Sequence, residues 1–227
     1  MKKIVTVIVI LSLCAVGCIG DGEETTEPSS SSTTAPTTPA SEQSLAEVLT
    51  PKYTDKMWAR HTVISGNQRT NLLVKMFEEV DMDIFETEMS GQGEKTVIQA
   101  WYAKSGETPL QGGLMKYVLK MGDTVYCKES TTPFFPPRPE EYASRTILRE
   151  TTYTTPTGKS VVAFVVTDGI KEYWFSSEVP FSLVKIRAQG EDILILDDFG
   201  FDAEKEISRE EIEHCRPMET PLETVSP

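Results

Sequence analysis

Cysteine and histidine are the residue types in this sequence best suited to nucleophilic or metal chemistry, and both are scarce. The 227 residues include four cysteines and two histidines: Cys14, Cys18, Cys127, Cys215, His61 and His214. Zinc sites commonly use Cys-x-x-Cys pairs, and that spacing does not occur. A Ser-His-Asp site would need one of the two histidines as its base, and the Gly-x-Ser-x-Gly pattern is absent. We therefore predict no metal site, no cofactor and no identifiable catalytic residue.

Two further patterns look like ligand sites but lack a necessary part. Gly158-Lys159-Ser160 ends like a phosphate-binding loop, yet Tyr153 stands where the first glycine is needed. The acidic run of residues 197–202 lacks the spacing of a calcium-binding EF-hand loop. We interpret the first as a hairpin turn and the second as a solvated turn. Among 35 acidic residues no carboxylate pair for glycoside hydrolysis can be singled out, so enzymatic activity stays open while a non-catalytic role is favoured.

The N-terminus has the layout of a secretory signal. Lys2 and Lys3 precede residues 4–17, an uncharged stretch that ends in small residues, and this order is typical of exported proteins. An uncleaved membrane anchor is the alternative. The uncharged run of residues 4–20 is 17 residues long, however, whereas a membrane-spanning helix normally needs about 20.

The end of that stretch, Ala15-Val16-Gly17-Cys18, resembles the lipobox of prokaryotic lipoproteins, and the Gly-Cys-Ile-Gly run is most similar to archaeal ones. The resemblance implies that a signal peptide of residues 1–17 is removed and that Cys18 carries a diacylglycerol-type lipid. The protein would then be anchored on the extracytoplasmic face of the cell membrane. Ala15 departs from the pattern, in which leucine is usual. The alternative is an ordinary apolar signal that happens to contain a cysteine.

The mature chain is expected to begin with a tether, residues 18–43. From Thr25 to Ser41, 14 of 17 residues are Ser, Thr or Pro, which cannot bury enough apolar surface to offset the entropy of ordering. Such a segment resembles an O-glycosylated stalk, and an unmodified flexible linker is the equal alternative.

The charge balance narrows the range of partners. Lys and Arg number 22 against 35 Asp and Glu, which gives a formal charge of −13. Affinity for nucleic acid depends on cationic side chains that displace counterions, and docking on anionic lipid depends on them too. The sequence therefore argues against a nucleic-acid partner and assigns membrane attachment to the lipid.

Cys127 and Cys215 would both lie outside the cytoplasm, where thiol pairs tend to oxidise. We predict a disulfide between them, which would close a loop of about 90 residues and stabilise the fold by about 4 kcal/mol. Two separate buried thiols are the alternative.

Residues 44–216 are expected to form one β-rich domain, followed by a loose tail of residues 217–227. Aromatic and β-branched residues alternate with polar ones in segments that we interpret as strands. These are residues 57–65, 95–104, 114–121, 123–128, 159–167, 170–176, 181–189 and 191–197. Residues 71–89 are also strand-like, with a helix over 70–80 as the alternative.

Three short helices are expected around these strands. Ser44 and Glu47 form a capping-box pattern, Ser208 and Glu211 form another in a helix over 204–214, and a third helix over 140–150 follows Pro139. The predicted fold class is α+β and β-rich, with one curved antiparallel sheet and two or three short helices.

The sequence contains the segment Tyr173-Trp174-Phe175-Ser176-Ser177-Glu178-Val179-Pro180-Phe181, followed by Leu183-Val184-Lys185 and a further expected strand. This segment resembles half-barrel envelope lipoproteins of the LolA/LolB type. The resemblance covers about residues 44–200 in outline. It implies a curved sheet around a hydrophobic cavity that is closed by helices and binds an acyl chain or an apolar segment of a partner.

Phe134, Phe135 and Tyr142 flank a proline-rich run and are candidates for contact with a ligand or partner; the alternative is that these rings only cap the sheet.

The function that we predict is a lipid-anchored extracytoplasmic protein that binds an apolar ligand or another envelope protein without catalysis. A surface hydrolase acting on glycans or lipids, and a structural envelope component, are the alternatives.

Overall fold

A computed structural model describes residues 43–50, 53–91, 93, 95–104, 113–129 and 142–218. Residues 39–227 form one compact unit, distinct from residues 1–38. The hydrophobic clusters of the described residues all lie between residues 45 and 215. The unit therefore contains its own cores and can be studied without the residues before it. The expected signal, Cys18, the tether up to residue 42, Phe134 and Phe135 lie outside the described residues.

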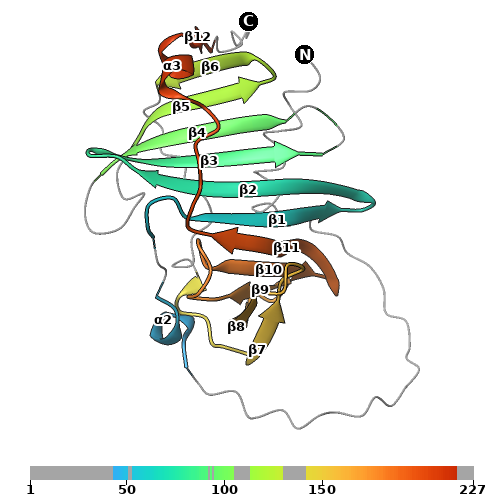
Figure 1. Ribbon diagram of the computed structural model, residues 1–227. Coiled ribbons are helices and arrows are strands. Elements are labelled where there is room, and N and C mark those ends of the chain that lie inside the picture. The colour runs from blue at the N-terminus through green and yellow to red at the C-terminus, as the bar shows by residue number, and fades with distance from the viewer. Residues whose placement is uncertain are drawn as a thin grey trace, which may run out of the picture. The chain divides into compact units, whose positions relative to one another are not determined.

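The described strands form a single twelve-stranded sheet (Figure 1). They are β1 (Trp58–Ser65), β2 (Gln68–Glu78), β3 (Met82–Ser90), β4 (Thr96–Ala103), β5 (Leu114–Met121), β6 (Thr124–Glu129), β7 (Arg149–Thr154), β8 (Ser160–Thr167), β9 (Lys171–Phe175), β10 (Leu183–Ala188), β11 (Glu191–Gly200) and β12 (Arg216–Pro217). Their order across the sheet is β12-β6-β5-β4-β3-β2-β1-β11-β10-β9-β8-β7. Apart from the parallel pair of β12 and β6, neighbours run antiparallel. The predicted antiparallel sheet is confirmed.

Two meanders make up this sheet. The first is β1–β6 and the second is β7–β11, and the pairing of β1 with β11 joins them. Each meander contains a tight turn at a glycine: Gly122 (φ +56°) joins β5 to β6, and Gly190 (φ +82°) joins β10 to β11. Glycine adopts positive φ without a steric penalty, so the turns expected at these two glycines form.

Residues 70–80 do not form the helix that was considered as an alternative. Residues 68–78 are β2, which pairs with β1 on one side and β3 on the other. Successive side chains of a strand point to opposite faces, and both faces are buried here: Met76 and Phe77 belong to different hydrophobic clusters. Packing on two faces outweighs the weak helical propensity of the segment.

The second meander is buried on both faces. Tyr173 and Phe175 of β9 pack in a cluster with Leu45 and Leu49, which come from helix α2 (Leu45–Val48) and the residue after it. Trp174, between them, belongs to a separate cluster with residues of β8, β10 and β11. The neighbouring rings of Trp174 and Phe175 therefore each enter a core of their own.

After β11, the chain crosses one face of the first meander, over β2 to β5, and reaches helix α3 (Arg209–Glu213) and β12 at the far edge (Figure 1). We call residues 201–218 the strap. Its apolar side chains pack on the sheet beneath: Ala203 on Phe77 and Ile84, and Ile207 and Ile212 on β4, β5 and β6. The predicted disulfide between Cys127 and Cys215 is confirmed, with 5.8 Å between the Cα atoms, and it joins the end of the strap to β6.

Three expectations about the helices and the tail need correction. The helix over 140–150 is wrong, because Thr146 bridges to Ser44 and β7 already begins at Arg149. The helix over 204–214 is shorter, although Ser208 caps it as predicted and Glu211 completes the capping box. The tail starts later than residue 217, since Pro217 pairs in β12 and the Met218 amide donates to the Cys127 carbonyl. No helix in the described part of the chain is long and apolar enough to cross a membrane.

Candidate functional site: two unlike faces of the first meander

The two faces of the first meander differ in chemistry. Residues paired across neighbouring antiparallel strands share a face, so the register sorts the side chains. Lys75 pairs with Glu86, and Glu86 pairs with Gln99; these define the strap face. The opposite face, which we call the apolar face, carries eight apolar side chains from five adjacent strands: Leu72, Val74, Met89, Ile98, Tyr117, Leu119, Met121 and Tyr126.

The apolar face is only partly buried. Met89 and Ile98 near its centre are 7% and 6% exposed, while the other six residues are half-buried. Burial raises the pKa of the Tyr117 hydroxyl, as expected where a phenolate would be poorly solvated. None of the eight residues belongs to a hydrophobic cluster formed by the described residues. They form a largely apolar surface outside these clusters, interrupted by Thr87 between Val74 and Ile98 and by Thr96 between Met89 and Met121.

One end of this face is closed by packed aromatic residues. Phe85 and Tyr102 meet edge to face with 6.0 Å between ring centroids, and Phe181 lies 5.9 Å from Phe85. Met57 and Met76 are fully buried among them. Phe181 comes from the connection between β9 and β10 and also contacts the core of the second meander. The apolar face therefore continues into packed protein where the two meanders meet.

The strap face is occupied by a polar network that binds the strap backbone. Glu86 accepts hydrogen bonds from the amides of Glu206, at 3.0 Å, and Ile207, at 3.3 Å. Lys75 Nζ donates to the Glu204 carbonyl at 2.9 Å. Gln99 Nε2 donates to the Ile207 carbonyl at 3.1 Å. Because these polar groups are used to hold the strap, this face has little left for a ligand.

Charges within the network compensate one another. Lys75 pairs with Glu86 at 2.9 Å and with Glu88, and Lys95 pairs with Glu88 at 2.7 Å. Burial on its own would lower the pKa of Lys75, but its hydrogen bonds to Glu88 and Glu86 outweigh burial and raise it. Burial likewise opposes ionisation of Glu88, and the two lysines reverse this and lower its pKa. We expect Lys75, Lys95 and Glu88 to stay ionised at neutral pH.

A second polar feature lies on the apolar side of β1. His61 is 3% exposed, and its Nε2 lies 3.0 Å from the Leu183 carbonyl. Ser182, the residue before Leu183, is fully buried. Within the described part of the chain, His61 Nδ1 and Ser182 Oγ are the two buried side-chain polar atoms without a hydrogen-bond partner. The sequence singled out His61 only as a possible base, and Ser182 was missed because only the fold buries it beside Leu183.

The other residues singled out in the sequence contact other residues of the domain. Tyr142 packs on Tyr173 and Phe175, with ring centroids 4.5 Å and 5.5 Å away, next to α2 rather than on the apolar face. His214 is exposed, and its Nδ1 contacts the Glu210 carbonyl at 2.9 Å. Asp197 accepts a hydrogen bond from Thr62, and Asp198 pairs with Lys159.

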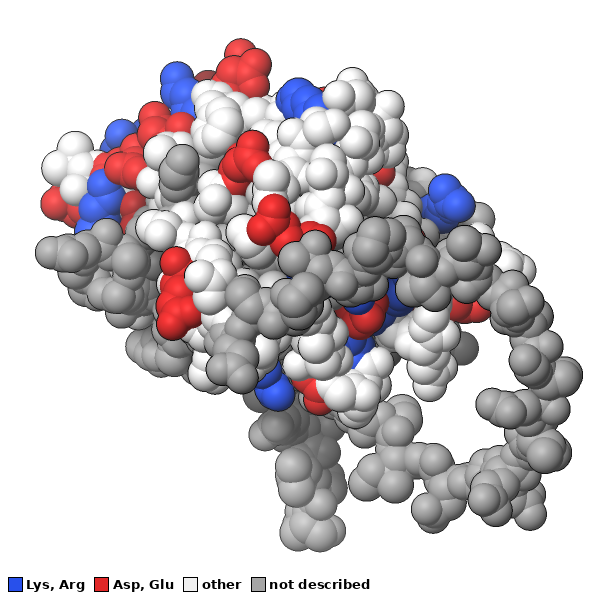
Figure 2. Space-filling model, turned by 90° about the horizontal axis from the view of Figure 1, so that it is seen from below, with Lys and Arg blue, Asp and Glu red and all other residues white. Residues whose placement is uncertain are grey.

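The described residues also contain no group of three or more His, Cys, Asp or Glu side chains placed to hold a metal ion. In the view of Figure 2, lysine and arginine residues are scattered among acidic ones. The geometry is thus that of an apolar surface with one buried polar corner.

Comparison with known proteins identifies no protein similar to this chain. No family model, no curated protein and no solved structure matches this chain.

Proposed function

We propose that this protein is a lipid-anchored extracytoplasmic lipoprotein whose sheet domain binds an apolar ligand on the apolar face. The lipid would be attached to Cys18, and the Ser/Thr/Pro-rich tether would separate the domain from the membrane. In this proposal the first meander acts as the curved wall of a half-barrel, as the resemblance to LolA/LolB-type carriers implies.

One observation carries the proposal: eight apolar side chains share one face across β2–β6, outside the clusters of the described residues. Apolar area removed from water contributes about 25 cal/mol per Å², so such a surface favours a ligand of the same character. Tyr117 and Tyr126 contribute large rings to it, and ligand pockets are commonly lined by aromatic and aliphatic side chains.

The test uses residues 39–227, expressed alone in an oxidising compartment and purified without detergent. The probe is N-phenyl-1-naphthylamine, whose fluorescence rises on transfer to an apolar site. We expect the unmodified domain to bind the probe and Leu119→Lys to bind it at least about tenfold more weakly. A charge placed against an apolar ligand loses its solvation without compensation, and 1.4 kcal/mol already corresponds to tenfold.

Val80→Lys is the matched control, because Val80 lies in the β2–β3 turn and is 91% exposed. It should bind the probe like the unmodified domain. Equal binding by Leu119→Lys and Val80→Lys, or no binding by the unmodified domain, would contradict the proposal. The latter result would favour an envelope partner protein or a structural role. Turnover of an ester or glycoside substrate would instead support the surface hydrolase.

A further inference from the structure

His61, which with Ser182 defines the polar corner, lies on the same side of the sheet as the apolar face. His61 pairs across the sheet with Leu72 of β2 and Leu196 of β11. Leu72 in turn pairs with Met89. Residues in such a row lie on the same face of the sheet. The His61 side chain therefore lies in one row with Leu72 and Met89 of the apolar face.

The hydrogen bond of His61 decides what its free nitrogen can do. The Leu183 carbonyl can only accept, so Nε2 carries the proton and donates to it at 3.0 Å. In the neutral ring Nδ1 is then an acceptor without a donor. Burial lowers the pKa of His61, against smaller opposing effects from Leu183 and Asp197, and so keeps the ring neutral.

Ser182 is held in place by its backbone rather than by its side chain. Its amide donates to the Val179 carbonyl at 2.9 Å, and its carbonyl accepts from the Ser176 amide at 2.8 Å. Phe181 and Ser182 have φ values of +61° and +60°, a left-handed conformation that costs residues other than glycine about 1–3 kcal/mol each. This turn fixes the Ser182 hydroxyl, which can donate and accept, next to Leu183.

An unpaired polar atom in the interior costs about 1–3 kcal/mol, and this corner keeps two of them. Apolar side chains of similar size would avoid these costs. A ligand group that donates to His61 Nδ1 and accepts from the Ser182 hydroxyl would satisfy both atoms. An alcohol hydroxyl does both, while an ether oxygen or a carboxylate can only accept.

We propose that the corner of His61 Nδ1 and Ser182 Oγ binds the uncharged hydroxyl group of an apolar ligand whose chain lies on the apolar face. This inference rests on the proposed function and adds the chemical class of the ligand: a long-chain alcohol. A carboxylate is disfavoured because Asp197, which acts electrostatically on His61, would repel it in a buried site.

The experiment compares 1-dodecanol with dodecyl methyl ether, in which a methyl group replaces the hydroxyl hydrogen, as competitors of N-phenyl-1-naphthylamine on residues 39–227. A neutral hydrogen bond contributes about 0.5–1.5 kcal/mol, so we expect the alcohol to bind roughly 3–10-fold more tightly than the ether. His61→Phe should abolish this difference, because the ether never used Nδ1.

Ser182→Ala should weaken both ligands by a similar factor, because both can accept from the hydroxyl. Ser160→Ala, in an exposed residue of β8, is the matched control and should change neither. If His61→Phe fails to fold, Ser182→Ala and the ligand pair still test the assignment. Binding of the probe without any preference for the alcohol would overturn the polar corner alone. Absence of probe binding would overturn the proposed function and this inference together.

Discussion

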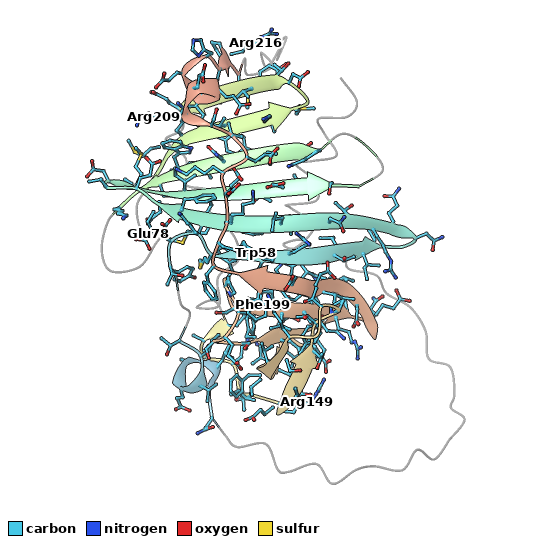
Figure 3. All side chains as sticks on the ribbon, in the orientation of Figure 1. Trp58, Glu78, Arg149, Phe199, Arg209 and Arg216 are labelled. Atoms are coloured by element: carbon cyan, nitrogen blue, oxygen red, sulfur yellow. A yellow bond between two sulfur atoms is a disulfide. The ribbon has the colours of Figure 1, made fainter. Side chains whose placement is uncertain are left out.

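Trp58 lies at the junction of the two meanders, where β1 pairs with β11 and the strap begins (Figure 3). Its indole Nε1 donates to Asp202 at 2.8 Å, which fixes the ring against the start of the strap. Lys159 approaches the rings of both Trp58 and Phe199, with its ammonium 5.7 Å and 4.9 Å from their centroids. One aromatic side chain therefore connects the first meander, the second meander and the strap.

Gly200 leaves room for this ring. A Cβ atom at Gly200 would lie 2.7 Å from Trp58 Nε1 and 2.9 Å from Cε2. We expect Gly200→Ala to destabilise the domain by about 1–3 kcal/mol, the usual cost of forcing extra volume into a packed site. The ring cannot move aside without losing its bond to Asp202. Urea unfolding followed by tryptophan fluorescence would measure the change.

Gly113→Ala is the control, because a Cβ atom there meets nothing within 4 Å. It should leave the free energy of unfolding almost unchanged. If Gly200→Ala unfolded at the same urea concentration as Gly113→Ala, the packing of Trp58 on Gly200 would have no energetic role.

The strap is the element whose stability depends most directly on a covalent bond. Cys127 and Cys215 are 88 residues apart in sequence, and closing a loop of that size is worth about 4 kcal/mol by the chain-entropy estimate. We expect the double variant Cys127→Ser, Cys215→Ser to lose about that much stability. Loss of amide protection should be largest in residues 209–218, as measured by hydrogen exchange.

The polar contacts at Glu86, Lys75 and Gln99 would still hold the middle of the strap in that variant. Residues 203–207 should therefore stay protected longer than α3. Equal loss of protection along the strap and in β8–β9 would instead mean that the disulfide acts on the whole domain and not on the strap.

Most strands were predictable because the alternation of their own residues indicates two faces, whereas β7 and β12 were missed. The alternation of residues 114–121 and the turn at Gly122 were sufficient for β5 and its hairpin with β6. The capping box at Ser208 and Glu211 likewise located α3. These are local signals, since the side chains and backbone involved are neighbours in sequence.

Elements whose structure depends on distant partners were missed. The segment 140–150 has a helix-like composition, but Ile147 is buried under α2 and the Leu148 amide donates to the Val165 carbonyl, so tertiary contacts override propensity. Residues 201–207, of which 204–207 were predicted as helix, form neither helix nor strand, and side chains of β2–β5 bind the backbone of residues 204, 206 and 207 instead. The polar corner depends on the register that brings His61 to Leu183, which no local pattern shows.

At the scale of the whole molecule, the proposed role requires a lipid at the start of the mature chain. The full chain is acidic, with a formal charge of −13, so electrostatic attraction to anionic lipid would not strengthen the anchoring. We expect Cys18→Ser to release the protein from lipid anchoring and to remove a lipid-sized mass from the N-terminal fragment. Membrane fractionation and intact mass of the protein from its native host would measure both. Retention of the same added mass in Cys18→Ser would contradict lipidation at this residue.

The ring closed by Cys127 and Cys215 also has a mechanical consequence. It encloses the whole second meander, from β7 to β11, between two residues at the far edge of the first. If the domain is pulled between its tether and its C-terminus, the 88 residues of the ring cannot extend, which withholds about 300 Å of chain at about 3.5 Å per residue. Tension would pass through the disulfide at one end. At the other end it would reach the second meander through α2, whose residues pack on β9. In a single-molecule pulling experiment, adding a reductant should lengthen the extension by that withheld chain.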